Sequence, residues 1–294
     1  MLGMWTVERD LFGIDSRSGA ARIVGMRRLL AFALVLLCTF VWLPAVSVEG
    51  EKPKGLRALM ICGGCCHDYT AQKKILSEGI SARAKVEWTI VHEDAPKGQD
   101  ERNHKVSIYS LPEWWKGYDV VVHNDCFGSV NDNAFIEGIT AAHQGGVPAV
   151  FLHCAVMSYR GGTTDEWRKC VGLTSTSHEK RRDLTVKRMV ADHPVMQGFP
   201  ETWLDKDDEL YKNEKVWPNF VPLAKAYGED TKKDHVVIWV NTYGKAKTFT
   251  TSLGHKNETM SDPVYLDLVT RGLLWVCDKL EDNGKPKPGF EASK

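Results

Sequence analysis

Histidines stand beside cysteines, or shortly before a carboxylate, at four places in the chain. The four places are CGGCCHD at 62–68, HNDC at 123–126, HC at 153–154 and HKNE at 255–258. An imidazole exchanges protons near neutral pH, and a nearby carboxylate stabilises its charged form. This combination indicates general acid–base chemistry, in which a positioned side chain gives a proton to a reacting molecule or takes one from it.

Each motif also has a purely structural interpretation. Cys62 and Cys65 have the spacing of a zinc or redox pair, but no second CxxC follows. The Gly63-Gly64 pair indicates a tight turn, because the Lys-Ser/Thr pair of a phosphate-binding loop is absent. His123 and His153, at the ends of apolar runs, fit hydrogen-bonded core positions as well as they fit a site. The grouping therefore counts for more than any one motif.

Apolar runs that alternate with helical patterns predict the elements that hold these residues. Short apolar runs are found at 56–62, 86–92, 118–124 and 148–153, and helical spacing at 69–83 and 132–144. Strands that alternate with helices predict an α/β fold with a doubly wound, mostly parallel sheet. Ligands of such sheets bind at the carboxyl ends of the strands, where the first three histidine motifs are expected.

The second half of the chain has a different pattern. Strand-like stretches are found at 184–190, 236–243 and 246–252, and Gly244 predicts a hairpin between the last two. An aspartate and a proline at 262–263 predict the start of a final helix that ends at position 277. We expect one domain over residues 55–280, followed by a flexible tail over residues 281–294.

The amino-terminal segment has the layout of a secretory signal peptide. Arg27-Arg28 precede an apolar run over residues 29–43, and the small-residue tripeptide Ala45-Val46-Ser47 follows. We expect a signal peptide at 26–47 and an extension, not part of the natural protein, at 1–25. An uncleaved membrane anchor is the alternative. In both cases the domain works outside the cytoplasm, and no membrane contact is expected after cleavage.

Composition limits the partners. The chain has 38 basic and 38 acidic side chains, so nucleic acid is not an expected partner. Ten tryptophans provide flat apolar faces that suit sugar rings. Of eight cysteines, Cys38 lies in the signal peptide, and seven remain. An odd number in an oxidising compartment leaves at least one free or metal-bound thiol.

In their order and spacing, these motifs resemble the ThuA-like (trehalose utilisation) family of the class I glutamine amidotransferase-like superfamily. The matching stretches are GG at 63–64, CHDY at 66–69, the strand at 118–124, GGVPAVFLH at 145–153, DELY at 208–211, YGK at 243–245, LGH at 253–255 and Glu258. The resemblance covers about residues 56–280. It implies a flavodoxin-like fold and a role in processing disaccharides or their keto derivatives in bacteria.

One departure from the amidotransferases argues against their chemistry. Their nucleophile lies in a Gly-x-Cys-x-Gly turn, whereas here His153 takes the cysteine position and Phe151 and Ala155 replace the glycines. Cys154 lies one residue further on, which points its thiol in another direction. We therefore do not expect glutaminase activity.

We expect a pocket that processes a small carbohydrate or an oligosaccharide by acid–base chemistry. His153 and His255 are the expected proton-transfer groups, and Glu258 is expected to orient His255. The other residues expected to bind substrate are His67, Asp68, Asn124, Arg160, Trp167, Glu209 and Tyr211. Taken alone, the acidic stretch at 205–211 also fits a solvated loop.

Two other hypotheses remain open on the sequence. One is a non-catalytic carbohydrate-binding module, in which the same polar groups hold hydroxyls and tryptophans stack on rings. The other is a metal-dependent hydrolase or isomerase with a single ion held by His67, His153 and His255. The leading hypothesis needs no cofactor, whereas the metal hypothesis needs a divalent ion. Association into a homo-oligomer is left open.

Overall fold

The computed structural model describes residues 55–292 of the chain. The predicted signal peptide and the extension before it lie outside these residues. Within the described part, no helix has both the length and the apolar composition needed to cross a membrane.

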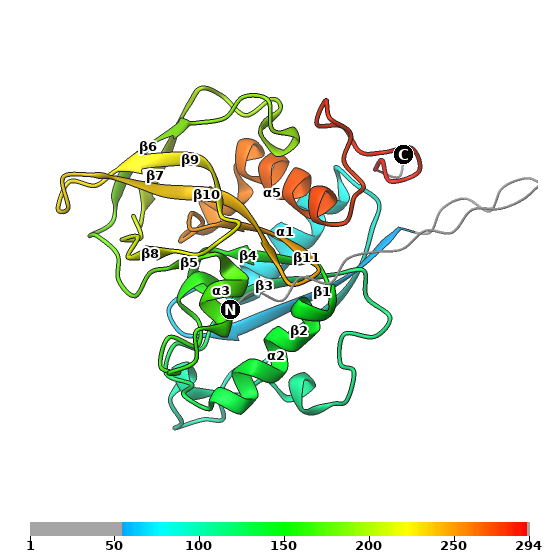
Figure 1. The fold of residues 1–294 in the computed structure, drawn as a ribbon, viewed down its shortest axis with the longest axis vertical. Helices are drawn as coiled ribbons and strands as arrows, with labels where there is room; N and C mark the ends of the chain where they lie inside the picture. The colour runs from blue at the N-terminus through cyan, green and yellow to red at the C-terminus, as the bar shows by residue number, and fades with distance from the viewer. Residues whose placement is uncertain (1–54, 293–294) are drawn as a thin grey trace, which may run out of the picture. The chain divides into compact units, whose positions relative to one another are not determined.

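Five parallel strands form one half of the main sheet (Figure 1). They are β1 (Leu56–Gly64), β2 (Val86–His92), β3 (Val120–Cys126), β4 (Ala149–Leu152) and β11 (Ala246–Thr251), in the order β2-β1-β3-β4-β11. The three central strands β1, β3 and β4 are buried almost throughout, because helices cover both faces. Such strands need apolar side chains on both faces, and this explains their continuous apolar sequences.

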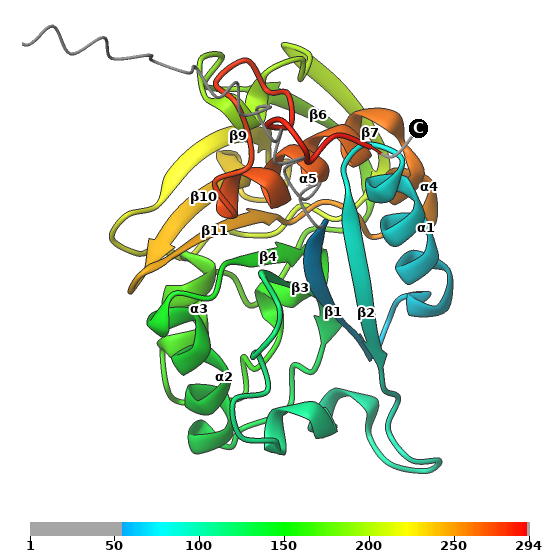
Figure 2. The ribbon, with the colours of Figure 1, turned by 90° about the vertical axis from the view of Figure 1, so that its right-hand side faces the viewer.

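Helices cover both faces of this half (Figure 2). On one face lie α1 (Tyr69–Ser81), α4 (Asn257–Ser261) and α5 (Pro263–Val276); on the other lie α2 (Asn133–Gly145) and α3 (Glu166–Val171). Aspartates cap three of these helices, since Asp68, Asp132 and Asp262 each accept a hydrogen bond from a backbone N–H of the first turn. Proline follows Asp262 at the first helical position, as predicted from the sequence.

Four antiparallel strands extend the sheet beyond β11. They are β10 (Asp234–Tyr243), β9 (Val221–Tyr227), β6 (Arg182–Arg188) and β7 (Thr202–Asp208), in the order β10-β9-β6-β7. Strands β10 and β11 pair antiparallel on either side of Gly244-Lys245. Two short strands, β5 (Leu173–Thr174) and β8 (Lys215–Val216), pair separately.

The predicted α/β fold class is confirmed, and the structure adds two features to the prediction. Strands β7 and β9 were not predicted, and β7 includes part of the acidic stretch that also fitted a loop. The segment expected to be a flexible tail is instead attached to the domain over residues 281–292. Its backbone bridges Ala84 to Glu291, and Phe290 packs against the core. In the sequence, only the apolar Phe290 among polar neighbours indicated this attachment.

Candidate functional site

Three imidazole rings meet at the carboxyl ends of the parallel strands. His67 follows β1, His153 follows β4 and His255 follows β11. The ring centroid of His67 lies 4.7 Å from that of His153 and 4.9 Å from that of His255, and the last two lie 5.5 Å apart. Neighbouring parallel strands end at the same edge of a sheet, so residues separated by up to 188 positions become neighbours.

The Glu209 carboxylate lies against two of these rings. One carboxylate oxygen is 3.5 Å from Nε2 of His153, and the other is 3.3 Å from Nδ1 of His255. Burial alone would raise the pKa of Glu209, but its contacts with the two histidines outweigh burial and hold the pKa well below the usual range. Glu209 is therefore a carboxylate anion at neutral pH.

His153 has hydrogen-bond acceptors on both sides of its ring. Its Nδ1 donates to the backbone carbonyl of Ser252 at 2.8 Å, and its Nε2 faces Glu209, with the Tyr211 hydroxyl at 3.4 Å. Burial alone would lower the pKa of His153, but Glu209 and the nearby Asp208 outweigh burial and raise it. The charged imidazolium, which has a proton on each nitrogen, is the form that fits these partners.

His255 is oriented by an arginine outside the cavity. Nη1 of Arg181 lies 3.2 Å from Nε2 of His255, and a guanidinium can only donate hydrogen bonds. Nε2 of His255 is therefore the acceptor, and in the neutral ring the proton lies on Nδ1, facing Glu209. That contact has the distance of an ion pair without hydrogen-bond alignment.

His67 is held in the neutral form. Burial, together with the charges of His153 and His255, lowers the pKa of His67 to about 3. Its Nδ1 is buried and has no hydrogen-bond partner among residues 55–292. A buried polar atom without a partner is costly in a folded protein, so this nitrogen is a place where a ligand atom would be stabilised. The site thus combines a charged imidazole with a neutral one.

A buried aspartate holds the loop that carries His255. The Asp208 carboxylate accepts hydrogen bonds from the backbone N–H of Gly254 at 2.7 Å and of His255 at 3.3 Å. Gly254 has φ +113°, and a Cβ there would lie 2.7 Å from the Tyr265 hydroxyl, so the turn requires glycine. Burial and the charge of Asp208 raise the pKa of Asp205 to about 9, and Asp205 is neutral beside it.

A small cavity of about 170 Å³ opens beside the three histidines. Its walls are formed by Cys65, Cys66, His67, Arg102, Cys126, Cys154, Met157, Arg160, His178, Glu209 and His255. A wider, open hollow of about 520 Å³ shares Cys66, His67 and His255 with it and adds Asp68 and Glu258. The histidine cluster thus faces both a small, partly enclosed space and a wider, open one.

The structure brings together six of the expected site residues. His67, Arg160, Glu209 and His255 line the small cavity, while His153 and Tyr211 lie directly behind it. Asp68 lines the open hollow, where its carboxylate also caps α1 and accepts a hydrogen bond from Asn257.

Three expected residues have other roles. Trp167 is 1% exposed and donates through its indole N–H to the carbonyl of Ala155, so it cannot stack on a sugar. Asn124 is buried behind the site, where its amide donates to Gln72. Glu258 is exposed at the start of α4, and the carboxylate that contacts His255 is that of Glu209. The carboxylate beside His255 is therefore that of Glu209, and not that of Glu258 as the sequence predicted.

Four residues that surround the cluster were not predicted from the sequence. His178 lies 3.7 Å from Glu209 and lines the cavity with Arg102, while Arg181 and Asp208 hold His255 as described above. Asp208 adjoins Glu209 in the DELY stretch, so a signal for it was present. His178 and Arg181 lie in a polar loop with no pattern of its own.

A family model described as ThuA, trehalose utilisation, matches residues 63–276. The chain belongs to the ThuA family. The match includes all the residues of the histidine cluster. A search of curated protein sequences gives no significant match.

Solved structures of ThuA-like proteins share the fold. One from Parabacteroides merdae has a TM-score of 0.62 at 19% identity, and the alignment covers 82% of this chain and 98% of that one. Another from Bacteroides uniformis has a TM-score of 0.59 at 15% identity, with the same coverage of 82% and 98%. At these identities the likeness concerns the fold, and the chemistry must be argued from the side chains.

Two disulfides lie in the wall of the small cavity. Cys65 is bonded to its neighbour Cys66, and Cys126 is bonded to Cys154. Cys62, Cys170 and Cys277 are free, which agrees with the expectation of at least one unpaired thiol. Cys62 and Cys65, the CxxC pair of the sequence, are not bonded to each other. Because its sulfur is bonded to Cys126, Cys154 has no free thiol.

The three histidines could also hold a metal ion. One nitrogen of each lies within 4.8 Å of the others. The contacts of the cluster oppose this use, because the Arg181 guanidinium occupies Nε2 of His255. Nδ1 of His153 donates to the carbonyl of Ser252 and its Nε2 faces Glu209, which raises the pKa of His153, whereas a metal ligand must be deprotonated. The partners present therefore fit proton transfer better than metal binding.

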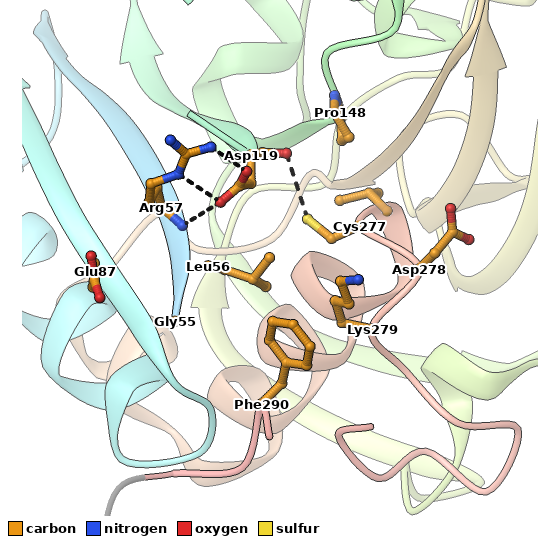
Figure 3. A pocket seen from close by; sticks show the side chains of 11 residues that line it. Gly55, Leu56, Arg57, Glu87, Asp119, Pro148, Cys277, Asp278, Lys279 and Phe290 are labelled. Carbon is orange, nitrogen blue, oxygen red and sulfur yellow. Dashed lines mark hydrogen bonds and ion pairs between the residues drawn. The ribbon is translucent and has the colours of Figure 1, made fainter. Parts of the chain in front are cut away.

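A larger cavity of about 710 Å³ lies at the opposite, amino ends of the same strands (Figure 3). Leu56, Asp119 and Pro148, at or next to the starts of β1, β3 and β4, contribute to its wall together with the end of α5. The Arg57 guanidinium donates to both oxygens of Asp119, at 3.1 and 2.7 Å. None of the expected site residues lines this cavity, so we place the site of this ThuA protein in the smaller one.

Proposed function

We propose that this ThuA-family protein converts a disaccharide or a keto-sugar outside the cytoplasm by acid–base chemistry. The observation that carries the proposal is the difference in surroundings of two adjacent imidazoles: Nε2 of His153 faces the Glu209 carboxylate at 3.5 Å, whereas the buried Nδ1 of His67 has no partner. The carboxylate favours the charged form of His153, which can give a proton, and burial favours the neutral form of His67, which can take one, so an acid and a base lie side by side in the cluster.

The proposed step is proton transfer on a sugar that carries a carbonyl. Nδ1 of His67, which has no partner, takes a proton from the carbon beside the carbonyl. His153 lies behind the cavity, so its proton passes from Nε2 to the facing Glu209 carboxylate, which lines the cavity and protonates the oxygen that gains negative charge. Glu209 stabilises the charged form of His153 before the transfer. This arrangement serves isomerisation or elimination, and the same acid can protonate a leaving oxygen in hydrolysis.

Glutaminase chemistry has little support in this site. The Cys154 sulfur is bonded to Cys126 and is not available as a nucleophile. His153 occupies the position at which the amidotransferases have their cysteine. The two disulfides also favour an oxidising compartment, in agreement with the expected signal peptide.

The test follows proton exchange rather than one guessed product. The purified protein is incubated in D₂O with a panel of disaccharides and their keto derivatives, and NMR follows deuterium at the carbon next to the carbonyl. We expect His153→Ala to lower turnover by about 10²–10⁴-fold while sugar binding persists. A matched control is His104→Ala, since His104 also lies beside a carboxylate, 3.1 Å from Glu93, but lines neither the cavity nor the hollow.

Two outcomes would favour the other hypotheses. Binding without turnover on any sugar of the panel, in the intact protein, would indicate a carbohydrate-binding module. One equivalent of tightly bound metal, with activity lost on chelation and restored by the ion, would indicate that His67, His153 and His255 act as ligands.

A further inference from the structure

Four cysteine sulfurs line one wall of the cavity in direct succession. The Cys65–Cys66 disulfide contacts the Cys126–Cys154 disulfide, because Sγ of Cys65 lies 3.8 Å from Sγ of Cys126. At this distance the two sulfurs are in van der Waals contact. The acid–base chemistry proposed above uses none of these sulfurs.

Access to the four sulfurs differs sharply. Cys66 is exposed, whereas Cys65, Cys126 and Cys154 are 8%, 2% and 5% exposed. A thiol in solution therefore reaches Cys66 first. From there, sulfur contacts continue inward through Cys65 to Cys126 and Cys154.

The backbone holds the two disulfides together. Strands β1 and β3 pair in parallel, and their last partners are Gly64 and Cys126. The N–H of Cys65 donates to the carbonyl of Cys126 at 3.3 Å. A Cβ at Gly64 would lie 2.3 Å from that carbonyl oxygen, so glycine permits this close approach. The contact between the disulfides is thus set by the sheet.

We propose that this cluster is a thiol–disulfide exchange site for a low-molecular-weight thiol. The thiolate attacks Sγ of Cys66, forms a mixed disulfide there and releases the Cys65 thiolate. The Cys65 thiolate attacks Sγ of Cys126, which forms a Cys65–Cys126 disulfide and releases the Cys154 thiolate. A second thiol then attacks the mixed disulfide, releases Cys66 and leaves as the oxidised disulfide of the small thiol.

The exchange is balanced and ends in a defined state. Two small thiols are oxidised to one disulfide, and the protein is reduced by two electrons, from two disulfides to one disulfide and two thiols. The final thiols are Cys66, at the surface, and Cys154, inside the cavity. Cys154 lies close to His67, since ligand atoms of His67, Cys126 and Cys154 are all within 4.8 Å of one another. Exchange at the surface thereby places a thiol beside the histidine cluster.

The experiment uses the intact protein and glutathione as the probe thiol. After short exposures the reaction is stopped with N-ethylmaleimide, and disulfide-linked peptides are identified by mass spectrometry. We expect glutathione on Cys66 first, then a Cys65–Cys126 link with maleimide on Cys154. In Cys66→Ser, the free Cys65 thiol should form the Cys65–Cys126 link without any added glutathione.

A double variant tests the route. With Cys65→Ser and Cys66→Ser together, opening of the Cys126–Cys154 disulfide should become slower by about tenfold or more, because its two sulfurs are nearly inaccessible. Cys170→Ala is the matched control, since Cys170 is a free, fully buried thiol outside the cluster. Equal opening rates in the double variant and the intact protein would overturn the proposal, as would a Cys66→Ser protein that keeps its Cys126–Cys154 bond. Neither result depends on sugar turnover, so this inference and the proposed function fail separately.

Discussion

The two ends of the parallel strands form cavities of opposite character. At the amino ends the cavity is large, about 710 Å³, and its principal charged pair is satisfied, with Arg57 bound to both oxygens of Asp119. At the carboxyl ends the cavity is about 170 Å³, and it contains a buried nitrogen of His67 without a partner beside a charged pair of His153 and Glu209. Unsatisfied and charged groups, rather than volume, distinguish the end that holds the candidate site.

Of the variants considered, Glu209→Gln should have the largest effect, because it removes the charged group that distinguishes the cavity at the carboxyl ends. Loss of the carboxylate removes a group that stabilises the charged form of His153, so we expect the pKa of His153 to fall. Turnover on any active sugar should fall by about 10²-fold or more. NMR titration of the imidazole protons measures the first effect without a substrate.

The matched change at the other end is Arg57→Gln, which breaks the ion pair with Asp119. Arg57 is half-exposed, so we expect little change in Tm and none in the titration of His153. A His153 pKa that stays raised in Glu209→Gln would show that another group charges the ring. Equal losses of turnover in the two variants would remove the distinction between the two ends.

The same pair predicts how stability depends on pH. The pKa of His153 is raised in the folded protein, so its contribution is present below about pH 6.5 and is lost as pH rises through the folded pKa. The pKa of Glu209 is lowered, so its contribution is present above about pH 4.3 and is lost as pH falls. The stability lost in Glu209→Gln should therefore be greatest between about pH 5 and 6.5.

Asp205→Asn should have a smaller effect, which concerns how stability changes with pH. Asp205 has a pKa of about 9 in the folded protein and an ordinary pKa when unfolded, so its contribution to stability falls as pH rises from about 4 to 9. We expect the variant to lose less Tm between pH 6 and pH 9 than the natural protein, by roughly 7 °C or more, because this interval corresponds to about 4 kcal/mol for one such group. Thermal unfolding at both pH values measures this. The same pH dependence in both proteins would show that Asp205 titrates normally.

Glu258→Gln should have the smallest effect. Glu258 is exposed at the start of α4, and Glu209 occupies the place beside His255. Turnover and Tm should both stay within experimental error of the natural protein. A tenfold loss of turnover in this variant would restore Glu258 to the site and would require α4 to move.

The parallel half of the fold could be predicted because its strands are apolar runs with clear boundaries. The expected strand at 86–92 is observed as β2 over Val86–His92. Strand β7 was hidden, since its sequence TWLDKDD alternates but includes three aspartates. Asp205 and Asp208 in this strand are buried, one of them protonated, and no pattern of residue types predicts a buried acid.

The residues of the candidate site that follow parallel strands could be predicted, and those that the antiparallel half contributes could not. The rule that ligands bind at the carboxyl ends of parallel strands was enough to group His67, His153 and His255. The choice between Glu209 and Glu258 depends on where the antiparallel strand β7 ends relative to the histidines, which the sequence does not reveal. Glu258 was favoured because it lies only three residues after His255. Trp167 was selected for its ring, but whether a tryptophan faces core or solvent is decided by packing.

Strand β7 is an edge strand, paired to β6 alone, yet Asp208 at its end and Glu209 just after it complete the histidine cluster. Edge strands open at lower free energy than the centre of a sheet. Detachment of β7 would free the loop of His255 and discharge His153 while the parallel core remains folded. The histidine cluster would then come apart at a temperature below the Tm of the whole domain. The onset of fast hydrogen exchange in β7 would mark that temperature.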